Sequence, residues 1–518
     1  MKLLRLHLWL MVLLAGSAQA AVRMSNVFSD HMVLQREQPV TVWGTAASSE
    51  VVTVRLAGQT ATATSDQSGK WQIHLKPLPA GGPHELIVSG QNTLTFKNVL
   101  IGDIWICAGQ SNMELTLGAV DMPATRSATN PKLRLLTIKS GQSNIPVNDV
   151  LNGWMECQPQ TARSFSAAGY FFAKRILAET GVPIGLVDNS WGGTGIDLWL
   201  NTAELHHAPE LDWLLQSHEK KAKVLNDQLL KHLDEVNRWL PLAQAAKLQG
   251  NPLPDAPKAP TGGGIGGIFN GRVAPLTRFP IKGVIWYQGE QDSKESDNYL
   301  AKQRALISGW RAAWNQGDFP FYFVQLPNFQ EPPTTPAGGD GWAHLREAQR
   351  RAIRVPHTGM AVTIDIGDAA SAHPLNKEDV GTRLALWALH YDYGQTNLVC
   401  SGPLYKDMTV EGNKVRISFD YAGHGLMVGK KVGNGPAQED HAGKLQRFAI
   451  AGANKQWYWA DAVIEGDTVL VSSPSVPQPV AVRYAFAMNP TGCNLYNRDG
   501  LPASPFRTDL WQTPTANK

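Results

Sequence analysis

One pentapeptide of the chain places a serine where nucleophilic chemistry is possible: Gly109-Gln110-Ser111-Asn112-Met113. It follows the largely apolar run 103–108, a pattern that predicts a buried strand. Gly109 permits a sharp turn, so the hydroxyl of Ser111 would stand at the carboxyl end of the strand and at the start of a helix. Backbone N–H groups there can stabilise an oxyanion. Ser111 is therefore the candidate nucleophile.

A pair of glycines follows a second predicted strand, 184–187. Gly192 and Gly193 lie in the segment 188–194, where residues without a Cβ let backbone N–H groups come close to a bound substrate. The pair predicts part of an oxyanion hole, with a tight loop of no chemical role as the alternative.

A third polar segment follows the strand 283–285. Gln288, Glu290 and Asp292 stand close together there, and such side chains are costly to bury unless each finds a partner. Gln288 could donate to an oxyanion, and the two carboxylates could orient neighbouring groups. A solvated polar loop is the alternative.

A histidine follows a fourth predicted strand, in the loop 365–374 that precedes a helix. His373 could accept the proton of Ser111 as a general base. All four polar segments come at the carboxyl ends of predicted parallel strands, which is where open α/β sheets bind ligands. We therefore expect them to form one site.

The elements that would position these groups divide the chain of 518 residues into several units. Residues 1–20 are typical of a signal peptide, with a basic start, an apolar stretch and an Ala-x-Ala cleavage site, so we expect an exported protein. Short strand-like runs over 21–98 predict a β-sandwich. Alternating strand and helix patterns over 99–395 predict a parallel sheet. Residues 396–518 predict a second β-rich module.

The segment 202–258 interrupts the alternation, and its leucine spacing predicts an inserted helical hairpin. The Pro- and Gly-rich stretch 251–267 then forms a long loop, either a wall of the site or a linker. The role of the insertion stays open.

Composition excludes several functions. A net charge of +3 without a basic block argues against nucleic acid as a partner. No mature segment is apolar over ~20 residues, so no membrane anchor is expected. No Cys/His spacing is typical of a zinc site. Four cysteines allow three pairings, of which Cys400–Cys493 is favoured, whereas Cys107 is expected to be a buried apolar residue.

The chain resembles the sialate O-acetylesterase-like branch of the SGNH hydrolases, a group of carbohydrate esterases. The likeness covers almost the whole mature chain, including Asp30 to Gln35 near its start and Asn494 to Asn497 and Gly500 to Pro505 near its end. In the expected catalytic domain it is carried by four motifs: Gly102 to Met113, Ser190 to Thr194, Ile285 to Glu290, and His373-Pro374-x-Asn376-Lys377.

The resemblance implies a flavodoxin-like three-layer α/β/α hydrolase domain flanked by β-sandwich modules. It implies acyl transfer through an acetyl-serine, with Ser111 as nucleophile, His373 as base, and no metal or organic cofactor. The oxyanion hole would combine the N–H of Ser111, a glycine of the Gly192-Gly193 pair and Gln288. Five further residues would bind the substrate or support the site: Gln110, Asn112, Trp191, Glu290 and Asp292.

The acid that normally holds the histidine is missing from its usual places. Many relatives carry an Asp two or three residues before the histidine, where this chain has Ser371 and Ala370. Asp368 is the nearest candidate, Glu290 is a more distant one, and a Ser–His dyad held by a backbone carbonyl is the alternative. Relatives usually show Glu-Ser-Asn at 290–292, so the charge of Asp292 could instead supply the missing acid.

We therefore expect an exported enzyme that removes acetyl groups from sugar hydroxyls. The substrate would be either O-acetylated sialic acid or an acetylated plant polysaccharide such as xylan or xyloglucan. One alternative is a carbohydrate-binding protein whose hydrolase domain has lost catalysis, which the missing acid would explain. A lipase or thioesterase would need a long apolar acyl groove, which no segment indicates. The oligomeric state stays open.

Overall fold

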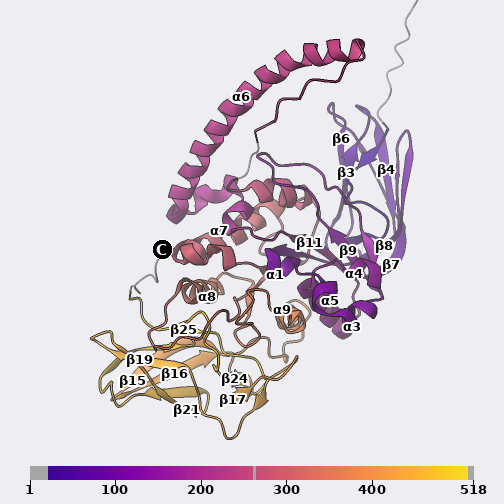
Figure 1. Cartoon of the computed structure of the whole chain (residues 1–518). Coiled ribbons are helices and arrows are strands. Elements are labelled where there is room, and N and C mark those ends of the chain that lie inside the picture. The colour runs from indigo at the N-terminus through magenta and orange to yellow at the C-terminus, as the bar shows by residue number, and fades with distance from the viewer. Residues whose placement is uncertain (1–20, 261–263, 512–518) are drawn as a thin grey trace, which may run out of the picture.

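The computed structural model describes residues 21–260 and 264–511. The expected signal peptide, 1–20, lies outside them. A twisted sheet forms the centre of the chain (Figure 1). Its strands are, in spatial order, β10 (Met155–Cys157), β9 (Asn130–Thr137), β11 (Ile184–Ser190), β8 (Thr93–Gly109), β12 (Gly283–Tyr287), β13 (Phe321–Val324) and β14 (Thr358–Ala361).

All neighbours on this path are parallel except β10 and β9. β8 precedes the other six strands of this path in the chain, yet it lies in the middle, because the strands that follow form first one side of the sheet and then the other. The crevice at such a reversal of strand order is where α/β proteins bind ligands. The register places Gly109 opposite Ser190 of β11 and Tyr287 of β12, so three strands end at one level.

Helices cover both faces of this sheet. On one face, Trp105 of β8 packs against Phe172 of α5 (Ala167–Thr180), and α5 in turn packs on α9 (Lys377–Tyr391). On the other, Trp286 of β12 packs against Trp310 of α7 (Ser296–Trp314), and α7 packs on α8 (Gly341–Ala352). The expected three-layer α/β/α fold is confirmed.

The amino-terminal module is a β-sandwich that shares a strand with the catalytic domain. One sheet contains β1 (Arg23–Met24), β3 (Val40–Thr45) and β6 (Lys70–Leu75). The other contains β2 (Val33–Gln35), β4 (Val51–Leu56), β5 (Gln59–Thr64), β7 (Gly81–Ser89) and the first half of β8. The expected boundary at 98/99 therefore falls inside β8, at Asn98, whose φ is 55°. One hydrophobic cluster runs through both units.

Strands β15 to β25 form the carboxyl-terminal module, which has a core of its own around Ile417, Ile450 and Val482 (Figure 1). They are β15 (Leu404–Glu411), β16 (Lys414–Asp420), β17 (Leu426–Lys430), β18 (Gln438–Glu439), β19 (Phe448–Gly452), β20 (Trp457–Trp459), β21 (Asp461–Glu465), β22 (Thr468–Ser472), β23 (Pro479–Tyr484), β24 (Leu495–Asn497) and β25 (Phe506–Arg507).

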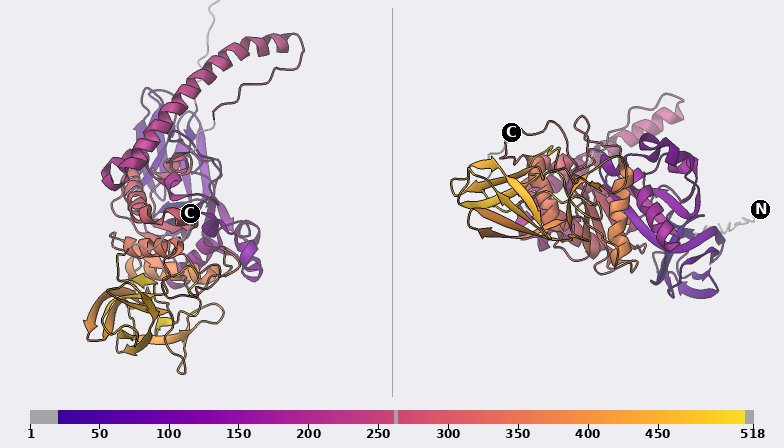
Figure 2. Two further views of the ribbon diagram at one scale, coloured as in Figure 1. Left: turned by 60° about the vertical axis from the view of Figure 1, so that its left-hand side comes forward. Right: turned by 90° about the horizontal axis from the view of Figure 1, so that it is seen from below.

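The insertion is a single helix, not the expected hairpin. After short turns at 202–211, α6 (Asp212–Leu248) runs for 37 residues and projects from the body (Figures 1 and 2). Its two groups of leucines lie on one continuous helix, and the Pro-rich segment 249–260 returns along it as extended chain, with Trp239 Nε1 donating to Pro254 O at 2.9 Å. Four prolines in that segment prevent the second helix.

The four cysteines are free thiols, so the expected Cys400–Cys493 disulfide is wrong. Cys400 lies near Tyr322 and Tyr421, whereas Cys493 lies beside Tyr484. Cys107 is fully buried in β8, as expected, and burial raises the pKa of its thiol. Among the described residues, no helix is long and apolar enough to cross a bilayer, and no cluster of His, Cys, Asp or Glu could hold a metal ion.

The contact between α5 and α9 leaves no room for a side chain at Gly381. A Cβ there would lie 2.6 Å from Phe172 N and 2.7 Å from Ala168 O, which are backbone atoms that cannot move independently. We expect Gly381→Ala to lower the free energy of unfolding by about 1–3 kcal/mol in a urea titration, despite a gain of about 1 kcal/mol in helix propensity. Gly309→Ala in α7 is the matched control, because its nearest neighbour is the Asn201 side chain at 3.1 Å. Equal stability of the two variants would contradict this account.

Candidate active site

Ser111 and His373 meet at the carboxyl edge of the sheet. Ser111 begins the short helix α1 (Ser111–Glu114) directly after the turn that ends β8, and His373 lies on the loop between β14 and α9. The Nε2 of His373 lies 2.7 Å from the Oγ of Ser111. The serine is half-buried and the imidazole is exposed, so a substrate can reach both. This distance allows direct transfer of the hydroxyl proton to the imidazole.

The turn before Ser111 is held by the strand on each side. Gln110 N donates to Tyr287 O of β12 at 3.0 Å, and Trp191 N donates to Gly109 O at 2.9 Å. Gly109 has a φ of 127°, and a Cβ there would lie 2.2 Å from Tyr287 O, so only glycine fits. The three strand ends therefore fix where the serine stands.

Asn112 and Glu290 are brought together under the serine. Asn112 is fully buried and Glu290 is half-buried, and Asn112 Nδ2 donates to Glu290 Oε1 at 2.5 Å and to Ala372 O at 2.8 Å. Burial raises the pKa of Glu290, and the hydrogen bond from Asn112 opposes that rise. The pair thus links the serine turn to the loop that carries His373.

The backbone donors of the expected oxyanion hole are only partly free. Gly192 N donates to Glu114 Oε2 at 2.7 Å. A Cβ on Gly192 would lie 3.5 Å from Ser111 Cβ, so this glycine does lie beside Ser111. In the described part of the chain, the N–H groups of Ser111 and Gly193 have no acceptor. Two of the expected donors are therefore unoccupied, and the third is bound to a carboxylate.

Gln288 does not point a free donor at the site. Its amide nitrogen donates to Thr194 O at 3.2 Å and to Asp292 Oδ2 at 2.5 Å, and its amide oxygen accepts from Tyr299 OH at 2.9 Å. The side chain is fully buried. This differs from the expected oxyanion role, because burial requires both of its N–H groups to be paired internally.

Asp292 forms a hydrogen bond with the segment that follows the Gly192-Gly193 pair. It is buried, and it accepts from Ile196 N at 2.9 Å as well as from Gln288. Burial raises its pKa, and these hydrogen bonds oppose the rise. Within the described residues it makes no contact with His373, so its charge acts on the loop that follows Gly193.

Gln110 and Trp191 contact the segments that surround the site. Gln110 Oε1 accepts from the N–H groups of Gly289 at 3.4 Å and Gln291 at 3.3 Å. The Trp191 ring lies 4.6 Å from the guanidinium of Arg272, which donates to three backbone carbonyls around it. Arg272 was not among the predicted site residues, because no pattern in the primary sequence connects it to the glycine pair.

No carboxylate of the described residues contacts the imidazole of His373. Asp368 Oδ1 accepts from Ala370 N at 2.9 Å, and the side chain is exposed on its loop. Glu290, the second candidate acid, bonds to Asn112 instead. The backbone N–H of His373 donates to Ser371 Oγ at 3.1 Å, so the residue that replaces the usual Asp caps the loop.

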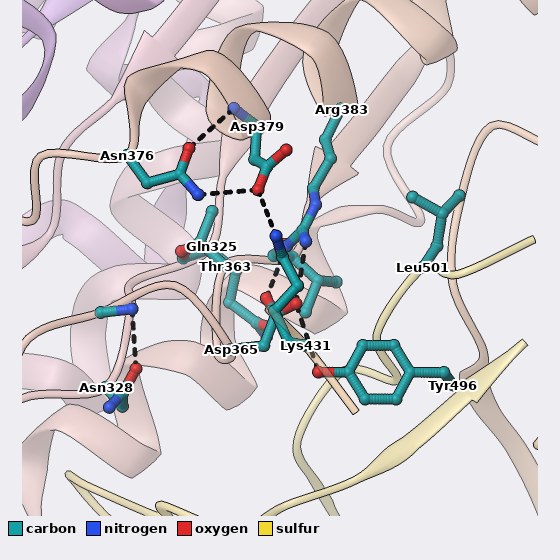
Figure 3. A network of polar contacts seen from close by, with 12 residues as sticks. Gln325, Asn328, Thr363, Asp365, Asn376, Asp379, Arg383, Lys431, Tyr496 and Leu501 are labelled. Atoms are coloured by element: carbon teal, nitrogen blue, oxygen red, sulfur yellow. Dashed lines mark hydrogen bonds and ion pairs between the residues drawn. The ribbon is translucent and has the colours of Figure 1, made fainter. Parts of the chain in front are cut away.

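The carboxyl-terminal module contacts the chain both at the start of the His373 loop and in the helix α9 that follows the loop (Figure 3). Asp365, at the start of the loop, accepts from Arg383 of α9 at 2.6 and 2.8 Å and from Tyr496 OH at 3.3 Å. Asp379, in the first turn of α9, pairs with Lys431 at 2.8 Å. Asp365 lies in the predicted loop 365–374, but its partners lie too far along the chain for their contacts to be inferred from the sequence.

A serine whose hydroxyl contacts a histidine at the carboxyl edge of a three-layer α/β/α domain defines a serine hydrolase. The family model described as "Carbohydrate esterase, sialic acid-specific acetylesterase" matches residues 101–224 and 271–388. The chain belongs to this family and is a serine ester hydrolase that acts as a carbohydrate O-acetylesterase.

Individual relatives agree with this assignment. A solved structure of a carbohydrate acetylesterase from Xanthomonas citri is 36% identical, with a TM-score of 0.78, and the match covers 95% of this chain and 100% of that one. The sialate O-acetylesterase of Homo sapiens is 27% identical over 95% of this chain and 93% of its own length. That of Mus musculus is 27% identical over 78% and 80%.

Proposed function

We propose that the protein is exported and hydrolyses acetyl esters of sugar hydroxyls through an acetyl-serine on Ser111, with His373 as the base. The observation that carries the proposal is the 2.7 Å contact between Ser111 Oγ and His373 Nε2. Their setting supports it, because two backbone N–H groups without an acceptor in the described chain, those of Ser111 and Gly193, come from the segments beside the nucleophile.

The reaction proceeds in two acyl transfers. His373 Nε2 takes the Ser111 proton while Oγ attacks the acetyl carbonyl, and the resulting oxyanion is stabilised by backbone N–H groups. Collapse of the intermediate breaks the bond to the sugar oxygen, which leaves with the proton from His373. Water, deprotonated by His373, then attacks the acetyl-serine, and acetate leaves as Ser111 regains its proton.

The histidine works as half of a dyad in this proposal. Asp368 binds a backbone N–H of its own loop, and Glu290 binds Asn112, so neither carboxylate is engaged with the imidazole. The loop itself then has to hold the ring near Ser111.

The charge beside the nucleophile favours a neutral sugar. Glu114 is exposed and lies one helical turn after Ser111. Its carboxylate accepts a hydrogen bond from Gly192 N at 2.7 Å. A sialic acid carries a carboxylate that this group repels, whereas xylan and xyloglucan backbones are neutral. An acetylated neutral polysaccharide is therefore the proposed substrate.

Removing the nucleophile or the base is the direct test. We expect Ser111→Ala to abolish hydrolysis of 4-nitrophenyl acetate, and His373→Ala to lower kcat/KM by about 10²–10⁴-fold, because general base catalysis contributes that much. Circular dichroism of each variant checks the fold. Hydrolysis by Ser111→Ala at the rate of an active wild type would refute Ser111 as the nucleophile, whereas no hydrolysis above background by either protein would support a carbohydrate-binding protein with an inactive hydrolase domain.

Asp368→Ala separates a triad from a dyad. Since this carboxylate makes no contact with the imidazole, we expect kcat/KM to change by less than about threefold, the size of effect that an exposed substitution has. Asp368→Asn is the matched variant, because it keeps an oxygen for Ala370 N. A loss of about 10³-fold or more in both variants would make Asp368 the acid after all.

Acetate release from three substrates identifies the sugar: acetylated xylan, acetylated xyloglucan and O-acetylated sialic acid. We expect either neutral polysaccharide to have a higher kcat/KM than the sialate. Glu114→Gln removes the charge and keeps an acceptor for Gly192 N–H, so it should raise the sialate rate by about two- to fivefold, the effect of an exposed charge pair. A faster reaction of the wild type with the sialate would exclude this preference.

A further inference from the structure

The peptide carbonyls on both sides of His373 are bound by buried side chains. Ala372 O accepts from Asn112 Nδ2 at 2.8 Å, and Pro374 O accepts from Lys377 Nζ at 2.8 Å. Asn112 is fully buried and Lys377 is 1% exposed. Buried donors that cannot exchange their partner for water hold those carbonyls more firmly than exposed ones would.

These two donors also bind each other. Lys377 Nζ donates to Asn112 Oδ1 at 2.6 Å, and Asn112 in turn donates to Glu290. Asn112 follows the nucleophile directly, and Lys377 lies in the first turn of α9. The backbone of the His373 loop is thereby tied to the turn that carries Ser111.

We propose that Lys377 is a positioning residue for catalysis: together with Asn112 it holds the backbone on both sides of His373, and so keeps the imidazole at the hydroxyl of Ser111. This rests on the proposed function of Ser111 and His373. In a Ser-His-Asp triad, a carboxylate holds the histidine by accepting from its second ring nitrogen. No carboxylate among the described residues makes that contact with His373. In this proposal the hydrogen bonds to the two carbonyls hold the histidine instead.

The two hydrogen bonds that Lys377 donates, to Asn112 and to Pro374 O, do not depend on the charge of its amine. Burial lowers the pKa of this lysine to about 7, against the opposing effect of Glu290. An ammonium offers three N–H donors and a neutral amine two, and the site uses two, for Asn112 Oδ1 and Pro374 O. Both hydrogen bonds therefore persist in either state.

The first turn of α9, which carries Lys377, is also held by the carboxyl-terminal module (Figure 3). Lys431 of the carboxyl-terminal module pairs with Asp379, and Gly435 N donates to the other oxygen of that carboxylate at 2.7 Å. Asn376 caps the helix by accepting from Asp379 N at 3.0 Å. These contacts hold the helical turn from which Lys377 extends to the His373 loop.

The test compares two esters in the variant Lys377→Met. A nitrophenolate leaves 4-nitrophenyl acetate without a proton, whereas the alkoxide of an acetylated sugar needs one from His373. Misplacing a catalytic group by 1 Å can cost about 10²-fold. We expect kcat/KM, which reports the acylation step, to fall by about 10²-fold for the sugar ester and by only about tenfold for the nitrophenyl ester. A loss of folded protein would lower both rates equally.

Three further variants complete the comparison. Lys302→Met in α7 removes an equally buried ammonium, which pairs with Asp197 and Glu295 and makes no contact with the His373 loop, so it should lower the melting temperature and leave the ratio of the two rates unchanged. Lys377→Arg keeps the donors and should restore the ratio towards wild type. If Lys377→Met does not accumulate as folded protein, Lys377→Gln replaces it, with a smaller change of the ratio in the same direction.

Equal losses for both esters in the Lys377 variants, or rates like those of the wild type, would overturn the positioning role. Ser111→Ala is measured alongside. Activity in Ser111→Ala would instead refute the proposed function itself, so the two failures are distinguishable.

Discussion

The site depends on the register in which β8 lies between β11 and β12. That register brings Gly109, Ser190 and Tyr287 to one level, and a Cβ at Gly109 would collide with Tyr287 O. Since the three strands end together, the serine turn, the glycine pair and the Gln288 segment share one edge of the sheet. Every other contact in the site refines this arrangement.

Polar side chains lie beneath this edge, and four of them form hydrogen bonds with one another and with the loops of the site. Gln288 donates to Asp292, which accepts from the loop after Gly193, while Asn112 donates to one oxygen of Glu290 and to the His373 loop. Leaving one such group unpaired costs roughly 1–3 kcal/mol. The same hydrogen bonds therefore stabilise the fold and define the geometry at Ser111.

Local patterns predicted the sheet and the two residues that meet on it. The Gly-turn at Ser111 and the loop of His373 both follow apolar strands, and the parallel order brings their ends together. The hairpin at 202–258 was wrong because leucine spacing does not show where a helix stops. The disulfide was wrong because pairing depends on distances that spacing does not contain. Lys377 stood in a recognised motif, but its reach to Pro374 O depends on how α9 is seated, which involves Lys431 from a distant module.

The strand β8 has a mechanical consequence for the whole chain. Its seventeen residues run without a linker from the amino-terminal sandwich to the turn before Ser111, and one hydrophobic cluster continues across the junction. The sandwich therefore does not move independently of the central sheet. A truncation that removed the sandwich would expose part of the hydrophobic cluster that the two units share. A recombination event that exchanged the sandwich would have to rebuild half of a central strand.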